Sequence, residues 1–491
     1  MKFRFAPLED FKRADLPAAP RSFWKLAGPG AVLVGLSIGA GEIIIWPRTV
    51  AQYGGGVIWA AVLGVFLQMW INFEIGRWTI VTGETVYTGY SRVWRGFGPL
   101  FLILTVLGWL APAWAQASGS ALKALLVGPQ FAAGTFWGSN TCWTTLTFLA
   151  VGVVLFGPKI AYRSVEKTIE LLVIIVTVGL IMVAFAVGTA DTWAELGRGM
   201  VNVGYRPPEM SVRHLFIAIV FAGAGGTANL FYTFYLRDKD IGMGARIPNI
   251  ENPLRGRTET IPSTGYLYAD TPENRARFRG WWSYVKKDQV LFFWFLNTVT
   301  LLLFIFGALA VLHPQRIVPA EGTLIWDQSQ ILGDVWGRWG EGWGRLGRNV
   351  FLLVGVATLF STQLAVVDGV SRSISDIVYT NFQAAQRRQL SWWYAVVAIV
   401  WIAAGCLITF VLERMQLQSQ QLGVLLNAAY MGGFAMAIYV PLTLLINLRY
   451  LPRSARPSLV CTGMMLLATL FYGGFALACL VWEIREIWPA S

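Results

Sequence analysis

The chain contains eleven apolar stretches of about the length that crosses a lipid bilayer. A hydrocarbon layer about 30 Å thick needs about 20 helical residues. Because a backbone in lipid must satisfy its own hydrogen bonds, such spans fold as α-helices. We therefore predict an all-α integral membrane protein with spans at 27–47, 56–82, 98–127, 141–157, 166–189, 213–236, 289–312, 349–378, 391–412, 420–447 and 458–482.

Composition and charge agree with this interpretation. Hydrophobic residues make up 55% of the 491 residues and charged residues only 13%. If the N-terminal arm, residues 1–26, lies in the cytoplasm, the cytoplasmic segments carry 28 of the 39 Lys and Arg. Positive residues resist translocation, so we expect a cytoplasmic N-terminus and, after eleven spans, an extracytoplasmic C-terminus in a prokaryotic inner membrane. The lipid bilayer accounts for the net charge of +12, and no nucleic-acid partner is expected.

Two long connections differ in character. The cytoplasmic one, 237–288, mixes prolines with ten basic residues and ends in Trp281 and Trp282, which predicts a partly ordered loop. In the extracytoplasmic one, 313–348, apolar side chains recur at steps of three and four residues. This spacing predicts an amphipathic helix on the outer surface that contains Leu332, Val335, Trp336, Trp339, Trp343 and Leu346.

Glu42 is the most informative polar residue, because it lies inside the first apolar stretch. An ionised side chain at membrane depth costs about 2.5–3.5 kcal/mol and is normally kept for function. Gly35, Gly39 and Gly41 surround it and weaken the helix there. A helix broken near the bilayer midplane frees carbonyls and amides that can bind a solute.

The sixth stretch contains a second glycine-rich segment, from Gly223 to Asn229. The two segments lie five spans apart, which predicts inverted repeats at 27–190 and 213–447 and a peripheral span at 458–482. Helices 1 and 6 are expected to be broken and to meet at one site. We expect its substrate-binding residues to include Gly39, Ala40, Glu42, Thr227 and Asn229.

Other polar residues permit a structural or a gating role. Asp368 and Arg372 lie four residues apart, and Glu74 and Arg77 lie three apart, so each pair shares a helix face and can form an ion pair near the cytoplasmic end. The four cysteines have no metal or redox spacing. No nucleotide-binding loop, hydrolytic triad or thiol pair is present in the sequence, so we expect neither an enzyme nor a cofactor.

Short motifs distributed along the chain add a family resemblance. They are Gly28-Pro29, Val57-Ile58-Trp59, Val81-Thr82-Gly83, Gly119-Ser120-Ala121-Leu122, Tyr235-Leu236 and Pro441-Leu442. With these motifs in this order, the chain resembles the Nramp family of divalent metal transporters. The resemblance implies a leucine-transporter-type 5+5 inverted repeat with one additional helix, and transport by alternating access.

The chain departs from the family at the metal site. The family's Asp-Pro-Gly-Asn falls on Gly39 to Glu42, so the aspartate is lost and a glutamate stands three residues later. Its Met-Pro-His falls on Leu230, Phe231 and Tyr232. Acidic positions of the third helix fall on Ala113 and Gln116, which cannot carry a proton. A substrate-contacting glutamine falls near Asn427, with Ala428 as the alternative one residue away.

The candidate ligand atoms that remain are oxygens, and the Glu42 carboxylate carries the only charge among them. Such a set of ligands suits a hard divalent ion such as Mg²⁺ better than Mn²⁺ or Fe²⁺. Ordinary Nramp proton coupling is not expected. Three alternatives stay open. Glu42 could pair with a small organic cation enclosed by Phe231, Tyr232 and Tyr235, Glu42 could be a proton carrier, or the protein could be a transport-inactive receptor or scaffold.

Overall fold

The computed structural model describes residues 5–20, 22–128, 131, 135–157, 161–248, 250, 264–320, 323–417 and 421–487. The α-helices are α1 Pro29–Ser37, α2 Trp46–Tyr53, α3 Ile58–Thr82, α4 Val86–Val93, α5 Phe97–Trp109, α6 Ala113–Leu126, α7 Asn140–Phe156, α8 Ala161–Val187, α9 Ala190–Val201, α10 Val212–Val220, α11 Tyr232–Asp238, α12 Pro272–Asp288, α13 Asn297–Gly307, α14 Leu324–Gly337, α15 Glu341–Asn381, α16 Leu390–Arg414, α17 Gln421–Tyr450 and α18 Leu459–Ile487.

Shorter elements join or interrupt these helices. The π-helical segments are η2 Ile38–Ile45, η7 Gln289–Leu296 and η8 Ala308–Leu312. The 3-10 turns are η1 Phe23–Lys25, η3 Gly55–Val57, η4 Phe136–Gly138, η5 Gly226–Phe231, η6 Gly242–Arg246, η9 Ala385–Arg387 and η11 Arg453–Ala455. Two short strands, β1 Lys12–Arg13 and β2 Tyr266–Leu267, pair in parallel.

The helices account for the predicted spans. Nine helical segments of the described residues are long and apolar enough to cross a membrane: Pro29–Tyr53, Gly55–Thr82, Phe97–Leu126, Arg163–Val187, Pro272–Leu312, Glu341–Asn381, Leu390–Arg414, Gly423–Tyr450 and Leu459–Arg485. The short apolar helix Asn140–Phe156 corresponds to the fourth predicted span. The sixth is divided among α10, η5 and α11, so it is too interrupted to count as one long helix. The prediction of an all-α membrane fold is confirmed.

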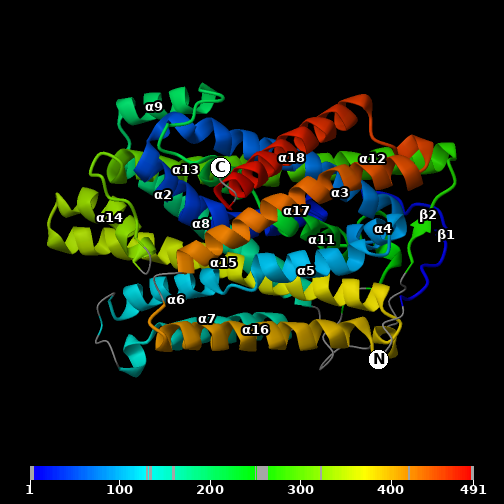
Figure 1. The fold of residues 1–491 in the computed structure, drawn as a ribbon, viewed down its shortest axis with the longest axis horizontal. Coiled ribbons are helices and arrows are strands. Elements are labelled where there is room, and N and C mark those ends of the chain that lie inside the picture. Colours follow the sequence, from blue (N-terminus) through cyan, green and yellow to red (C-terminus); the bar gives the residue numbers. More distant parts are fainter. Residues whose placement is uncertain are drawn as a thin grey trace.

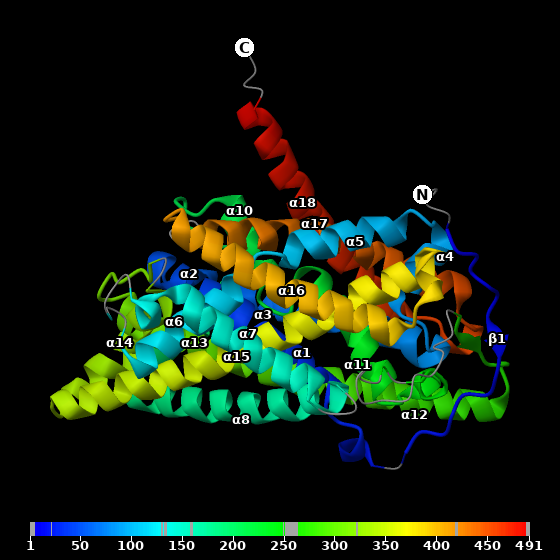
Figure 2. The ribbon, with the colours of Figure 1, turned by 90° about the horizontal axis from the view of Figure 1, so that it is seen from below.

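The spans form an elongated bundle with two distinct ends (Figure 1). One end, here the arm end, carries β1, β2 and α4, and the other, here the hairpin end, carries α9 and α14. Figure 2 shows that α18 leans away from the bundle. Many apolar side chains of α18 are exposed, among them Leu459 and Leu470, which agrees with a peripheral, lipid-facing helix.

Of the two predicted breaks, the structure has the one in the sixth span and a continuous helix in the first. In the sixth span the chain leaves the α-helix after Val220 and resumes as 3-10 helix at Gly226. Gly225 and Gly226 have φ values of 72° and 51°, a conformation that a side chain disfavours. In the first span the chain stays helical, but it widens into the π-helix η2 around Glu42. The first span is therefore continuous and not broken as predicted, and its π-helical segment is an arrangement often found at functional sites.

Both long connections differ from their predicted boundaries. The loop predicted at 237–288 ends earlier, because α12 begins at Pro272 and runs through η7 into the seventh span. The single amphipathic helix predicted in 313–348 is two helices, α14 and the start of α15, joined by a turn at Gly340. Its glycines permit close packing, since a Cβ at Gly344 would lie 3.0 Å from the Gly333 carbonyl oxygen.

The N-terminal arm crosses the arm end of the bundle. The amide of Ala6 donates to the Asn381 carbonyl of α15 (2.9 Å), and the amide of Leu16 donates to Asn274 Oδ1 of α12 (3.1 Å). Between these points β1 pairs with β2. The arm therefore fastens the ends of the seventh and eighth spans to each other.

Candidate functional site

Glu42 lies in the π-helix η2 and its side chain is fully buried. Neither carboxylate oxygen has a hydrogen-bond partner within the described residues. The hydroxyl of Thr300 lies beside the carboxylate, and it is also 3.1 Å from each of two carbonyl oxygens of its own helix turn, those of Leu296 and Asn297. A buried carboxylate without partners is costly, which points to a ligand or a proton at this position.

Close contact with the sixth span explains one glycine beside Glu42. A Cβ added at Gly41 would lie 1.4 Å from the Phe221 carbonyl oxygen, so no side chain fits there. Phe221 follows the last residue of α10. Because Gly41 has no side chain, the π-helix can pack directly against the break of the sixth span.

Gln68 of α3 bridges the break in the sixth span. Its Nε2 donates to the Val220 carbonyl (2.9 Å), and its Oε1 accepts from the amide of Gly225 and from Asn229 Nδ2, each at 3.2 Å. Asn229 Nδ2 also donates to Tyr439 Oη of α17 (3.1 Å). One buried amide side chain thus supplies partners for backbone groups on both sides of the break.

Asn297 connects the first and sixth spans. The hydroxyl of Ser37 donates to Asn297 Oδ1, and Asn297 Nδ2 donates to the Ala222 carbonyl (3.1 Å). All of these side-chain groups are buried. The seventh span therefore holds the end of α1 and the broken segment in a fixed relation.

Aromatic rings cover the other side of the break. Trp109 Nε1 donates to Thr227 Oγ1 (3.0 Å), and the Trp109 ring lies 6.2 Å from the Phe221 ring and 6.1 Å from the Phe231 ring, between centroids. A narrow crevice opens along this segment. Its lining residues are Leu104, Gly108, Trp109, Phe221, Gly226, Thr227, Ala428 and Gly432.

Not all predicted site residues meet here. Gly39 and Ala40 lie in η2 with Glu42, and Thr227, Asn229 and Leu230 lie in η5 at the break, with the Leu230 side chain buried. Asn427 is exposed and accepts a hydrogen bond from Arg213 Nη2 (2.5 Å), so its role at the site stays a prediction. Its neighbour Ala428, the alternative position from the sequence analysis, lines the crevice.

The Tyr232 side chain contacts the carboxylate of Asp288, a residue that the sequence analysis placed in a loop. Its hydroxyl donates to Asp288 Oδ2 (2.7 Å), while Asp288 Oδ1 accepts from the amide of Gly30 at the start of α1 (3.2 Å). Asp288 is fully buried. The sequence analysis placed Asp288 in a loop because the residues before it are polar. Polar sequence gave no sign that a helix there continues into the seventh span.

The candidate ion pairs lie at the arm end. Arg77 pairs with Glu74 (2.8 Å) and stacks over Trp282, 3.8 Å from the ring centroid. Arg372 pairs with Asp368 (2.8 Å) on its own helix and also with Asp238 at the end of α11. Every charged partner in these pairs is buried, so removing one would leave a charge in a low-dielectric interior.

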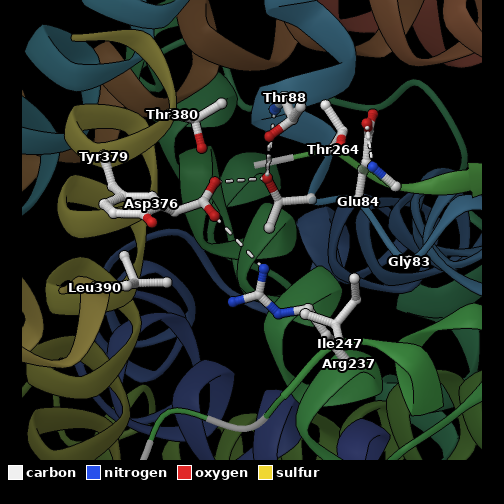
Figure 3. A pocket seen from close by; sticks show the side chains of 12 residues that line it. Gly83, Glu84, Thr88, Arg237, Ile247, Thr264, Asp376, Tyr379, Thr380 and Leu390 are labelled. Carbon is white, nitrogen blue, oxygen red and sulfur yellow. Dashed lines mark hydrogen bonds and ion pairs between the residues drawn. The ribbon is translucent and has the colours of Figure 1, made fainter. Parts of the chain in front are cut away.

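A small pocket lies beside these pairs (Figure 3). Asp376 accepts from Thr85 Oγ1 (2.6 Å) and lies 3.5 Å from Arg237 Nη1. Glu84 pairs with Arg92 and accepts from the amide of Gly265 (2.8 Å). Burial raises the pKa of Glu84 although Arg92 favours its charged form.

No ready-made chelating cluster occurs in the part of the chain that the structure describes. There, no group of three or more His, Cys, Asp or Glu side chains is arranged to hold a metal ion. Glu42 is the one carboxylate that η2 contributes. A metal ion at this site would therefore depend on backbone, amide or hydroxyl oxygens, or on water, for its other ligands.

Comparisons with known proteins establish the fold. No family model matches the chain, and no curated protein matches it at a significant level. A single-residue variant of the Eremococcus coleocola manganese transporter superposes with a TM-score of 0.68 at 15% identity, over 99% of this chain and 93% of that one. The same transporter in complex with an aromatic bis-isothiourea substituted compound gives 0.67 at 15% identity, over 99% and 92%.

MhsT in complex with L-phenylalanine superposes with a TM-score of 0.53 at 12% identity, over 95% of this chain and 99% of that one. The chain thus has the fold shared by Nramp and leucine-transporter-type proteins. At these identities the likeness shows the fold alone, and the residues of the site must carry any statement about function.

Proposed function

We propose that the protein is a secondary transporter that moves a small cation across a membrane by alternating access, with Glu42 as the charged ligand. The observation that carries the proposal is the fully buried Glu42 carboxylate, which has no hydrogen-bond partner within the described residues. It lies in a π-helix that touches the break of the sixth span through Gly41 and Phe221. Discontinuous helices at this depth are the usual construction of a transport site.

The chemistry of the ligands favours a hard divalent ion such as Mg²⁺ over Mn²⁺ or Fe²⁺. Asn229 Oδ1, like the Glu42 oxygens, is a buried acceptor without a partner in the described structure. Oxygen ligands suit hard ions, and Mg²⁺ keeps several waters and needs only one or two carboxylates. Leu230 stands where the family has a soft methionine, so affinity for thiophilic ions is reduced.

An organic cation is the second candidate, because aromatic rings line the break. Trp109, Phe221 and Phe231 surround Thr227, and Trp109 also packs on Trp114 with 5.0 Å between ring centroids. Aromatic faces attract cationic groups. In this case Glu42 would pair with an ammonium group, and no divalent ion would be transported.

Flux measurements separate the two candidates. Purified protein in liposomes should take up Mg²⁺ in a saturable manner, with much weaker uptake of Mn²⁺, and Glu42→Gln should abolish the flux. As a matched control, Glu483→Gln removes a partly exposed carboxylate of α18 and should leave uptake unchanged. Failure of wild-type protein to move any divalent ion, together with uptake of an organic cation, would replace the first candidate by the second.

The buried ion pairs fit a gate at the arm end, and the distribution of positive residues supports a cytoplasmic location for this end. Arg372 joins Asp368 of the eighth span to Asp238 of the sixth, and Arg237 reaches Asp376. These pairs connect elements of the broken helix to α15. Opening toward the cytoplasm would require them to separate.

A further inference from the structure

The seventh span changes from charged to apolar along one exposed face. Two exposed lysines, Lys286 and Lys287, stand near the end of α12. One turn later the exposed side chains of η7 are apolar, namely Val290, Leu291 and Phe295. Because helical residues four apart share a face, Lys287 lies directly before Leu291 on the same side of the span.

This change from charged to apolar marks the edge of the hydrocarbon layer. At a rise of about 1.5 Å per residue, Lys287 lies about 6 Å before Leu291 along the helix axis. The headgroup region on each side of a bilayer is roughly 5–8 Å thick. The two lysines therefore lie at the depth of lipid phosphates when Leu291 and Phe295 lie in the hydrocarbon.

The N-terminal arm places a third basic residue at the same depth. The Phe23 ring lies 5.3 Å from the Tyr284 ring and 6.3 Å from the Phe292 ring, between centroids, so the turn η1 packs against this part of the seventh span. In Figure 2, η1 is the short blue coil outside the bundle, near the junction of α12 and the seventh span. The other two residues of the turn, Trp24 and Lys25, are exposed, Trp24 at 70%.

The three lysines have no ion-pair partner among the residues that the structure describes. No carboxylate oxygen there lies within 4.0 Å of the ammonium group of Lys25, Lys286 or Lys287. Asp288, the next residue, is buried and accepts from other donors. Glu166 of α8 forms its ion pair with another lysine. The positive charges of the three lysines are thus available to an external anion.

We propose that this surface binds an anionic phospholipid. The headgroup site, here the lysine patch, consists of Trp24, Lys25, Lys286 and Lys287. Basic residues at the membrane surface attract anionic lipids, and tryptophan is enriched at headgroup depth. Exposed Leu291 and Phe295 continue the same surface into the hydrocarbon, where acyl chains cover them. A lipid therefore matches both the charged and the apolar part of the surface, and a soluble anion matches only the first.

A bound lipid would join the N-terminal arm to the seventh span. Lys25 belongs to the arm, and Lys286 and Lys287 belong to α12, so one headgroup would contact both elements. The turn η1 leads into α1, whose continuation η2 carries Glu42. Anionic lipid should therefore fasten the start of the first span. The inference does not depend on the proposed transport function.

Native mass spectrometry of the delipidated protein in detergent tests the site, with phosphatidylglycerol as the probe and phosphatidylcholine as the reference. The wild type should bind phosphatidylglycerol about tenfold more tightly. Lys25→Ala and Lys287→Ala should each weaken this binding about fivefold, the effect of one basic residue near an anionic surface, and the double variant about 25-fold. Arg279→Ala is the matched control. It removes an exposed charge on the same helix, about 12 Å farther from the hydrocarbon than Lys287, and should bind as the wild type does.

A competition experiment distinguishes a lipid from a free anion. Glycerol phosphate carries the headgroup charge without acyl chains, so it should not displace phosphatidylglycerol at equal concentration. Size exclusion and thermal unfolding check that each variant, which is altered only at exposed residues, remains folded. Equal affinity for the two lipids, full displacement by glycerol phosphate, or unchanged phosphatidylglycerol binding by the double variant would overturn the inference.

Hydrogen exchange tests whether the lipid fastens the arm. The amides of Leu26 and Ala27 both donate to the Phe23 carbonyl (3.1 Å each), which closes the turn η1. Their exchange should slow when phosphatidylglycerol replaces phosphatidylcholine, and the Lys25→Ala variant should show no such slowing. Exchange rates that do not differ between the two lipids in the wild type would reject the fastening of the arm.

Discussion

At the scale of single residues, a charged side chain at membrane depth was predictable from the sequence, and a polar side chain that bridges backbone groups was not. Glu42 was identifiable because a carboxylate in an apolar span has few structural uses. Gln68 was not, because an amide in a span more often joins helices, and its bridging position depends on a tertiary contact with Val220 and Gly225. Sequence alone left Asn427 and Ala428 as alternatives, because a shift of one residue on a helix turns the side chain to another face.

Replacing Gln68 by leucine should lower the thermal stability of the detergent-solubilised protein. The substitution leaves the Val220 carbonyl and the Gly225 amide without this partner, and each unsatisfied buried group costs about 1–3 kcal/mol. Gln363→Leu is the matched control, because Gln363 is a buried amide with neither polar atom bonded in the described structure. Equal melting temperatures for the two variants would contradict the bridging role.

Replacing Gly41 by alanine should abolish cation binding even though the ligands remain. The added Cβ would meet the Phe221 carbonyl oxygen at 1.4 Å, so the first and sixth spans must separate. Gly463→Ala in α18 meets no atom within 4 Å and should bind as the wild type does. Binding of Mg²⁺, measured by calorimetry, distinguishes the two variants, and unchanged affinity in Gly41→Ala would show that the close contact is not required.

At the scale of elements, hydrophobic length predicted the spans well, but boundaries failed where polar sequence stays helical. Apolar runs identify what lies in lipid, and they carry no information on helices that extend beyond it. For this reason α12 was taken for loop, and α14 and the start of α15 were read as one helix. The π-helix η2 was also not predictable, because it depends on contacts with α15 and on Gly39.

Replacing Arg372 by methionine should destabilise the arm end strongly. Asp368 and Asp238 would then be buried without their cation, and breaking a buried pair typically costs about 3–5 kcal/mol. Arg275→Met breaks a pair that is partly exposed, which typically contributes at most about 1 kcal/mol. Thermal unfolding of both variants measures the contrast, and similarly small decreases in stability for the two would argue against a stabilising role for the Arg372 pairs.

At the scale of the whole molecule, the fold followed from span number, charge bias and paired glycine-rich segments. The direction of the bundle in the membrane rests on the charge bias alone. Positive residues concentrate at the arm end, in the arm itself and in the connections beside α4 and α12. Substrate identity could not be predicted in the same way, because the residues expected at the family's metal-ligand positions differ from the family pattern and leave several substrates open.

A protease-sensitive tag at each terminus tests the orientation. In intact spheroplasts an external protease should remove a tag at the C-terminus and leave one at the N-terminus, because the positive segments stay in the cytoplasm. Lysed cells should lose both tags, which controls for access to the cleavage sites. Removal of the N-terminal tag from intact spheroplasts would reverse the assignment and place the arm-end pairs outside.

Calorimetric titration of the purified protein with Mg²⁺, Ca²⁺ and Mn²⁺, repeated on Glu42→Gln, tests whether Glu42 is the charged ligand of a divalent-cation site. If Glu42 is the charged ligand, binding should be saturable, strongest for Mg²⁺ and abolished by this substitution, with Glu483→Gln binding normally. Absence of binding of any of these ions by a folded wild-type protein would contradict it, and so would binding that Glu42→Gln leaves intact.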